Sequence, residues 1–253
     1  MLRTPALGRR AAFMGTSFMG AAFMGAAFMG AAALAGCQAP PIPVAEPRLG
    51  TDRTGYVILQ APISRRTREL FIADMDRLLS LKPAALTVFL ASPGGTLVDA
   101  QAMAAYVTQV QANGVPVTMH NLGLVASAAC YLFLAGQRRL SVPQGHFLFH
   151  QAALVSSGPV SMTSQQLQEL SRDAQAMEQA LIQTLVSRTR LTEAEAQTFV
   201  RRTVVLSADE ARRDGVTDQT APAAPPLGST GFAIRYAPDP AAAPATPPAA
   251  PTP

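Results

Sequence analysis

The chain has 253 residues, of which 20 are lysine or arginine and 16 are aspartate or glutamate, so that its formal net charge at pH 7 is +4. The cations are scattered along the sequence, and this modest excess gives no indication of nucleic-acid binding. The sequence contains two cysteines and three histidines, so few thiols and imidazoles are available for chemistry at neutral pH.

The first 37 residues have the composition of an export signal. Arg3, Arg9 and Arg10 form a basic leader, and an apolar run follows in which "AAFMG" recurs before the chain reaches "ALAGC". Basic, apolar and small residues in this order are typical of a targeting segment, and a five-residue repeat is too short to form a stacking unit. The ending resembles the bacterial lipobox, which implies lipidation of Cys37 as the mature N-terminus. An ordinary membrane anchor with an incidental cysteine is the alternative.

A lipid on Cys37 implies a domain that is attached to a membrane of the bacterial cell envelope and faces the periplasm. Gln38 follows the cysteine where some lipoproteins have aspartate, and this resembles proteins sorted to the outer membrane. Cys130 would then have no disulfide partner, and its apolar surroundings predict a buried core residue.

Proline-rich segments flank one domain. Residues 38–50 read as a linker, and residues 51–220 are long enough to bury a sizeable core. Residues 221–253 contain too many prolines for helix or sheet interior, so we predict a disordered tail in which "GFAIRY" is a possible short docking strand.

Strands and helices are predicted to alternate in the first half of the domain. "YVILQ" (56–60) and "LTVFLA" (86–91) read as buried strands, separated by a segment whose apolar residues recur at helical spacing. A second helix follows Gly95 and stops at "NG", before the strand "VPVTM" (115–119). This order predicts an α/β fold with a mostly parallel sheet and right-handed crossovers, whose chemistry gathers at the carboxyl ends of the strands.

The second half adds two strands and a long helix. "RRLSV" and "HFLFHQ" are strand candidates separated by a "PQG" turn. Thr163 and Gln166 predict the start of a long helix whose narrow apolar stripe suits packing on another helix or another subunit. Ser207 and Glu210 form a capping-box pattern for a short helix that ends near Gly215.

Two turns could carry chemistry. The glycines of "ASPGG" (91–95) allow a sharp turn and leave amides free for an anion, although taken alone the motif is a plain tight turn. Ser127 lies four residues after Gly123, where a helix is expected to follow the third strand, and the amide of Ala128 could point to the same place. Because position 129 is Ala129, the pattern is not G-x-S-x-G, and alone Ser127 would be a helix N-cap.

The histidines differ in their suitability as a general base. His150 ends the strand "HFLFH", at the sheet edge where Ser127 is expected. His146 begins the same strand and should be a surface residue at the far end. His120 is near the Ser127 turn in sequence and is a second candidate base. Alternatively, it is a polar residue at a strand end whose hydrogen bonds are satisfied. A serine, a histidine and oxyanion amides are the minimum for acyl transfer.

Several motifs together resemble the Clp protease proteolytic subunit. "SPGG", "GLVASAACYLFLAG", "PQGHFLFHQ", a long helix and "VVLSADEARRDGVTD" occur in the family's order over nearly all of residues 51–220. The resemblance implies a crotonase-like fold with a long handle helix through which homo-oligomeric rings associate. It implies Ser127 as nucleophile, His150 as base, Gly94 and Ala128 as oxyanion amides, peptide or protein substrates, and neither metal nor cofactor.

The sequence departs from this family at the third member of the triad. The position of the aspartate that orients the histidine is Thr203, which offers no charge to stabilise the imidazolium. Losing that carboxylate costs about 10⁴ in rate in a well-studied serine protease. The chain is therefore expected to be slow, to use Asp173, Asp209 or Asp218 instead, or to be inactive.

A second departure is the compartment. Cytoplasmic family members receive substrates from an ATPase, and neither that partner nor ATP is expected outside the inner membrane. The protein would act alone on peptides or loosened chains.

Of three alternatives, the first two are disfavoured and the third is the serious rival. Signal peptide peptidases share the fold but use a lysine base, and the only lysine, Lys82, is expected at the wrong end of the sheet. An acyl-CoA enzyme of the crotonase type would need neither Ser127 nor His150. A catalytically impaired pseudoenzyme, acting as an oligomeric binding or scaffold lipoprotein, is favoured by Thr203.

Overall fold

The computed structural model describes residues 46–151 and 161–235. The predicted export signal, Cys37 and most of the predicted linker lie outside the described residues. The strands are β1 (Thr54–Gln60), β2 (Ala85–Ser92), β3 (Val117–Ala126), β4 (Arg138–Ser141), β5 (His146–Phe149), β6 (Val204–Ser207), β7 (Gln219–Thr220) and β8 (Phe232–Arg235). The helices are α1 (Arg65–Ser80), α2 (Leu97–Ala112), α3 (Ala128–Leu134), α4 (Ser164–Arg188), α5 (Glu193–Arg201) and α6 (Ala208–Arg213).

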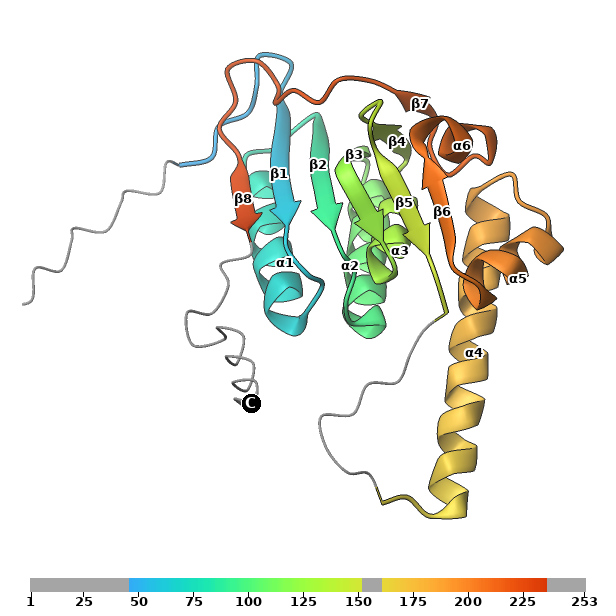
Figure 1. Ribbon diagram of the computed structural model, residues 1–253. Helices are drawn as coiled ribbons and strands as arrows, with labels where there is room; N and C mark the ends of the chain where they lie inside the picture. Colours follow the sequence, from blue (N-terminus) through green and yellow to red (C-terminus); the bar gives the residue numbers. More distant parts are fainter. Residues whose placement is uncertain (1–45, 152–160, 236–253) are drawn as a thin grey trace, which may run out of the picture. The chain divides into compact units, whose positions relative to one another are not determined.

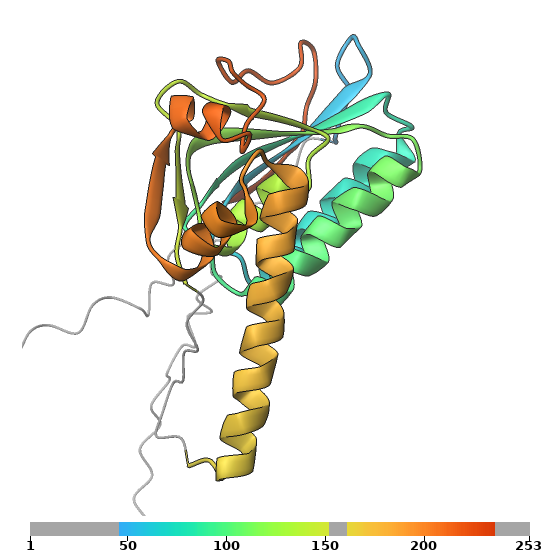
Figure 2. The same cartoon turned by 90° about the vertical axis from the view of Figure 1, so that its right-hand side faces the viewer.

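The strands of the described region form one sheet in the order β6-β5-β3-β2-β1-β8. All pairings along this path are parallel except that between β5 and β6, and β4 and β7 form a parallel branch beside β3. Figures 1 and 2 show α1 and α2 covering the same face of the sheet. The predicted α/β class with a mostly parallel sheet is confirmed.

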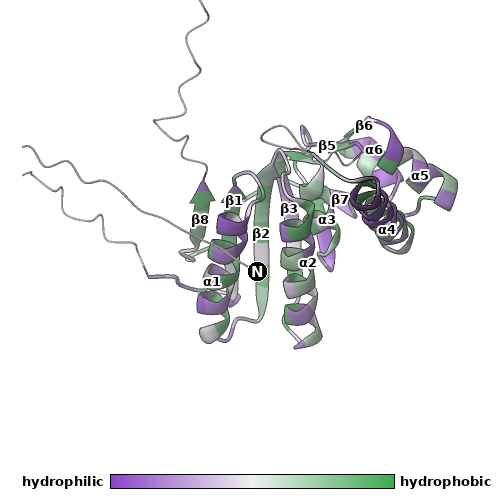
Figure 3. Cartoon of the chain, turned by 90° about the horizontal axis from the view of Figure 1, so that it is seen from below, coloured by the Kyte–Doolittle hydropathy of each residue, from purple (hydrophilic) through white to green (hydrophobic). Residues whose placement is uncertain are grey.

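Apolar residues at the predicted periodicities build the core. Val57 and Leu59 of β1 are fully buried, as are Phe71, Met75 and Leu78 on one face of α1. Figure 3 shows polar and apolar bands alternating along α1, whereas α4 is coloured mainly as polar. Burial of the α1 face therefore fixes the helix on the sheet, since each fully buried large side chain contributes about 1.5–3 kcal/mol.

Strand β3 is longer than expected and changes partners along its length. Its first half pairs with β4 and its second half with β5, so the "PQG" turn does not make a hairpin. The register against β2 shifts between Leu90 and Ser92. At this irregularity the buried Asn121 side chain donates to the His146 carbonyl (3.1 Å) and accepts from the Gly123 amide (2.8 Å). Asn121 thereby redirects the end of β3 that leads to Ser127.

The C-terminal boundary of the domain lies later than expected. The segment "GFAIRY" does supply a docking strand, because β8 pairs in parallel with β1 and buries Phe232 and Ile234. The guanidinium of Arg77 lies 4.7 Å from the centre of the Phe232 ring. The prediction of a disordered tail is therefore wrong for residues 221–235, and its remainder lies outside the described residues.

Helix α4 begins as predicted, with a reciprocal capping box between Thr163 and Gln166. Its buried residues are confined to the C-terminal half, where Leu181, Ile182 and Leu185 pack on the core. Leu167 in the first half is 60% exposed. Figure 2 shows this half extending beyond the sheet. Among the helices of the described residues, none is both long and apolar enough to cross a bilayer.

Candidate active site

Ser127 occupies a strained turn between β3 and α3. Its backbone has φ 54° and ψ −126°, a conformation that L-residues other than glycine rarely adopt. The Ser127 amide donates to the Leu148 carbonyl at 2.7 Å, which anchors the turn to β5. The side chain makes no capping hydrogen bond to α3. Ser127 is thus not an ordinary N-cap, and the turn has the form of a nucleophile elbow without the G-x-S-x-G sequence.

The glycine turn after β2 lies directly against this elbow. A Cβ atom on Gly94 would be 2.6 Å from Ser127 Cβ, 2.6 Å from the Ala126 carbonyl oxygen and 3.1 Å from the Ala128 amide nitrogen. Gly94 also has φ +93°. Both the space and the backbone conformation therefore require glycine, and the fold brings the "SPGG" turn against Ser127.

The amides of the glycine turn differ in availability. The Gly94 amide already donates to the buried Ser92 hydroxyl at 3.2 Å. Ile63 braces the turn by donating to the Gly94 carbonyl (2.7 Å) and accepting from the Thr96 amide (3.0 Å), and neither bond uses the Gly95 amide. Within the described residues, the amide without a partner in this turn is therefore that of Gly95. The resemblance implied the Gly94 amide as the oxyanion donor instead, because the contacts of Gly94 with Ser92 and Ile63 are not visible in a local motif.

The amide of Ala128 is the second donor near the elbow. It belongs to the first residue of α3, where backbone N–H groups have no partner within the helix. Its nitrogen is close to the Cα of Gly94, so the two turns face each other across a short gap. Backbone amides so arranged can stabilise a developing oxyanion.

We expect Gly94→Ala to destabilise the protein more than Gly114→Ala. Gly114 has a similar φ of +87°, but nothing lies within 4 Å of a Cβ there, so it is a matched control for backbone strain. That strain costs about 1–2 kcal/mol, and the collision at Gly94 should add about 1–3 kcal/mol. Urea unfolding of both variants measures the difference. Equal losses would contradict the close packing of Gly94 on the elbow.

His150 follows β5, beside the strand that leads to Ser127. The parallel register Ala126↔Leu148 places the residues after these two strands at the same sheet edge. The His150 side chain is exposed, and its Nδ1 lies 2.8 Å from the Gln151 carbonyl oxygen. In the described part of the chain no hydrogen bond joins it to Ser127. The two residues share an edge of the sheet.

Thr203 directly precedes β6, at the end of the sheet where His150 follows β5. Strands β5 and β6 are antiparallel with Phe149 opposite Val204, and continuing this register by one residue puts Thr203 opposite His150. Thr203 is exposed. Thr203 therefore lies at the same edge of the sheet as His150.

The candidate replacement aspartates lie elsewhere. Asp209 is in the first turn of α6, after Ser207, which pairs with His146 at the other end of β5. Asp218 accepts hydrogen bonds from the Arg139 amide (2.7 Å) and guanidinium (3.3 Å). Asp173 is on the exposed half of α4. The structure therefore brings neither Asp209 nor Asp218 to His150, and shows no contact between Asp173 and His150.

The remaining reactive side chains are separate from this edge. Burial lowers the pKa of His120, whose Nε2 lies 3.1 Å from the Ala221 carbonyl oxygen. His146 is exposed at the start of β5, as predicted. Cys130 is fully buried, and burial raises the pKa of its thiol. Lys82 precedes β2 at the amino end of the sheet, about 23 Å from its carboxyl end by the rise of seven residues, which disfavours a serine–lysine pair.

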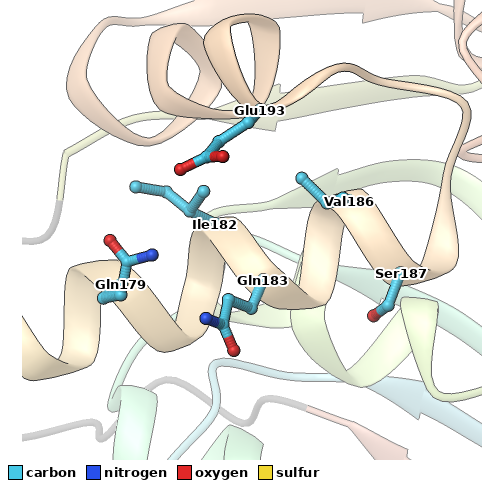
Figure 4. Close-up of a pocket in the computed structure, with 6 residues that line it drawn as sticks. All are labelled: Gln179, Ile182, Gln183, Val186, Ser187 and Glu193. Atoms are coloured by element: carbon cyan, nitrogen blue, oxygen red, sulfur yellow. The ribbon is translucent and has the colours of Figure 1, made fainter.

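A shallow hollow elsewhere on the surface contains none of these residues. It lies where α5 begins beside α4, and Figure 4 shows its lining residues, which are Gln179, Ile182, Gln183, Val186, Ser187 and Glu193. In the described parts of the chain, no group of histidine, cysteine, aspartate or glutamate is arranged to hold a metal ion.

A parallel α/β sheet that presents a serine elbow, a two-glycine turn and a histidine at one edge has the layout of a serine hydrolase. The sequence matches the Clp protease family over residues 48–223. The chain belongs to that family.

Relatives support the same assignment. The chain is 34% identical over 103 residues to ATP-dependent Clp protease proteolytic subunit 2 of Treponema denticola, covering 39% of this chain and 49% of the relative. It is 31% identical over 137 residues to the subunit of the same name from Corynebacterium jeikeium, covering 53% of this chain and 62% of that relative. The matches thus span about half to three fifths of these relatives. A ClpP1 mutant from Listeria monocytogenes shares the fold, with a TM-score of 0.55 and 20% identity over 67% of this chain and 91% of that one.

Proposed function

We propose that the protein is a serine-type peptidase that hydrolyses peptides or loosened proteins through an acyl-enzyme on Ser127. The observation that carries the proposal is the strained turn at Ser127, whose hydroxyl is not used as a cap and which packs against Gly94. Such strain is rarely kept without a functional reason. Family membership supports the same reaction class.

The proposed reaction uses four groups. The Ser127 hydroxyl attacks the substrate carbonyl, and His150 accepts its proton. The amides of Gly95 and Ala128 stabilise the oxyanion. His150 then gives the proton to the leaving amine as the C–N bond breaks. Water attacks the ester by the same route in reverse, which releases the acid and restores Ser127.

The substrates and assembly are also part of the proposal. No ATPase is required, because peptides and loosened chains need no unfolding before they reach the edge. The exposed first half of α4, with Leu167 60% exposed, supports association with further copies of the chain.

We expect the protein to act in the bacterial cell envelope, held by lipid on Cys37 and facing the periplasm, with the outer membrane favoured. In bacteria fed a labelled fatty acid, the full-length chain should incorporate the label, and Cys37→Ala should abolish incorporation. Cys130→Ala is the matched control and should incorporate normally, because that thiol is buried. Equal labelling of the parent and Cys37→Ala would contradict the predicted attachment.

The proposed chemistry is tested by a fluorophosphonate, which reacts with activated serines. We expect one adduct by intact mass, located at Ser127 by peptide mapping. Absence of an adduct in folded protein would favour the second candidate function.

That second candidate is a pseudoenzyme acting as a scaffold or binding lipoprotein. Two observations favour it. Thr203 supplies no carboxylate opposite His150, and the His150 ring lies against the Gln151 carbonyl instead of contacting Ser127. A folded chain that neither reacts with the probe nor hydrolyses peptides would support it.

A further inference from the structure

Three loops lie together at the amino ends of the strands, opposite the edge with Ser127. The Thr51 amide donates to the Leu227 carbonyl at 3.0 Å, and the Ala84 amide donates to the Arg53 carbonyl at 3.0 Å. The Arg53 guanidinium also donates to the Lys82 carbonyl. Residues 50–53, 81–84 and 226–229 thus form one continuous surface, here called the amino-end surface. Figure 1 shows the first and last of these loops together above the strands.

The amino-end surface combines exposed apolar residues with cations. Leu227 is 81% exposed, the highest value among the large apolar residues of the described chain, and Leu81 is 38% exposed. Arg53 and Lys82 are exposed beside them, and Asp52 is the only acidic residue in these three loops. Exposed leucines on a surface that also carries two cations match the chemistry of an anionic lipid surface.

The two cations also have strained backbones. Within the described residues, only three residues other than glycine have a positive φ: Arg53 (61°), Lys82 (54°) and the candidate nucleophile Ser127 (54°). Such residues cost stability and are concentrated at functional sites. Glycine would adopt these conformations without strain, so the presence of Arg53 and Lys82 at strained positions supports a use for their side chains.

The entry of the chain into the domain is at the same place. The Arg48 amide donates to the Thr230 carbonyl at 2.8 Å, just before the loop that begins at Gly50. Arg48 is exposed and adds a further cation. The N-terminal part of the chain, where an anchor is predicted, therefore joins the domain beside the amino-end surface.

We propose that the amino-end surface rests on an anionic lipid bilayer. Leu227 and Leu81 enter the headgroup region, and Arg53 and Lys82 contact lipid phosphates. The edge with Ser127 then faces away from the membrane and stays open to substrates. This orientation goes beyond the proposed peptidase function and does not depend on Ser127 being reactive.

The chain contains no tryptophan, so one introduced tryptophan reports on its own surroundings. Leu227→Trp places the reporter on the amino-end surface. Val98→Trp is the matched control, because Val98 is also apolar and exposed (55%) but lies in the first turn of α2, directly after the glycine turn. Both full-length variants are mixed with vesicles of phosphatidylglycerol and brominated phosphatidylcholine, whose bromine atoms quench fluorescence at bilayer depth.

We expect Leu227→Trp to lose about half of its fluorescence and Val98→Trp to lose little, because only the first reporter reaches the headgroup boundary. Adding Arg53→Gln and Lys82→Gln should reduce the quenching of Leu227→Trp several-fold. The same two substitutions should have little effect on the quenching of Leu227→Trp by vesicles without phosphatidylglycerol. Far-UV circular dichroism verifies that each variant is folded.

Equal quenching at the two positions would overturn the proposal, since it would show adsorption without orientation. Quenching at neither position would overturn it too. If the chain sediments with vesicles while Leu227→Trp stays unquenched, the anchor holds the chain and the proposed contact is wrong. Intact mass of the same samples shows whether Cys37 carries lipid, and a fluorophosphonate adduct reports separately on the peptidase proposal.

Discussion

Replacement of Ser127 by alanine is expected to abolish reaction with a fluorophosphonate and to lower peptide hydrolysis about 100-fold. Loss of the serine from a complete triad costs about 10⁶ in rate, whereas a triad without its aspartate has already lost about 10⁴. The ratio of these two losses, about 100-fold, is the rate enhancement that Ser127 can still supply in this chain. Alanine keeps the Cβ atom that packs on Gly94, so the fold should be retained.

His150→Ala should lower hydrolysis by a similar factor, because the serine then has no base. His146→Ala is its matched control, since both histidines flank β5 and both are exposed, but only His150 is at the carboxyl end. Initial rates on a fluorogenic peptide, with urea unfolding of each variant, measure the effect. Equal losses for His146→Ala and His150→Ala would contradict the assigned base.

Thr203→Asp is expected to raise the hydrolysis rate by on the order of 10² or more, because it puts a carboxylate opposite His150 where the imidazolium forms. Thr203 is exposed at the start of β6, so the substitution buries no charge. Turnover on the same fluorogenic peptide measures the gain, and the second-order rate of fluorophosphonate labelling reports on the serine directly.

Thr203→Asn separates charge from shape. Asparagine resembles aspartate in size but cannot stabilise the imidazolium electrostatically, so its rate should stay within a few-fold of the parent. A gain as large as that of Thr203→Asp would show that orientation alone limits the parent. Absence of any gain in Thr203→Asp would mean that His150 is not held by this position, and would favour the scaffold function.

The local patterns of the sequence determine most of the elements. The apolar spacing of Phe71, Met75 and Leu78 predicts α1, and the capping boxes at Thr163 and Ser207 predict where α4 and α6 begin. These features are short-range, because helical periodicity and caps involve residues a few positions apart. The alternation of strand and helix patterns likewise indicated the α/β class and the sheet edge that carries Ser127.

Contacts between residues distant in sequence could be identified only from the tertiary structure. The approach of Gly94 to Ser127 requires β2 and β3 to be neighbours and β3 to be redirected at Asn121. The availability of the Gly95 amide depends on the brace from Ile63. No local propensity encodes these contacts, because they arise from strand pairing and register.

The same distinction explains the C-terminal boundary. Prolines after residue 220 disfavour regular structure locally, yet Phe232 and Ile234 gain enough buried area against β1 to order a strand. The sequence by itself thus determined the fold class, the helix starts and the reactive residue types. The tertiary structure decided that Gly94 lies against Ser127, that Thr203 and His150 share an edge of the sheet, and where the domain ends, because burial and pairing outweigh local preference.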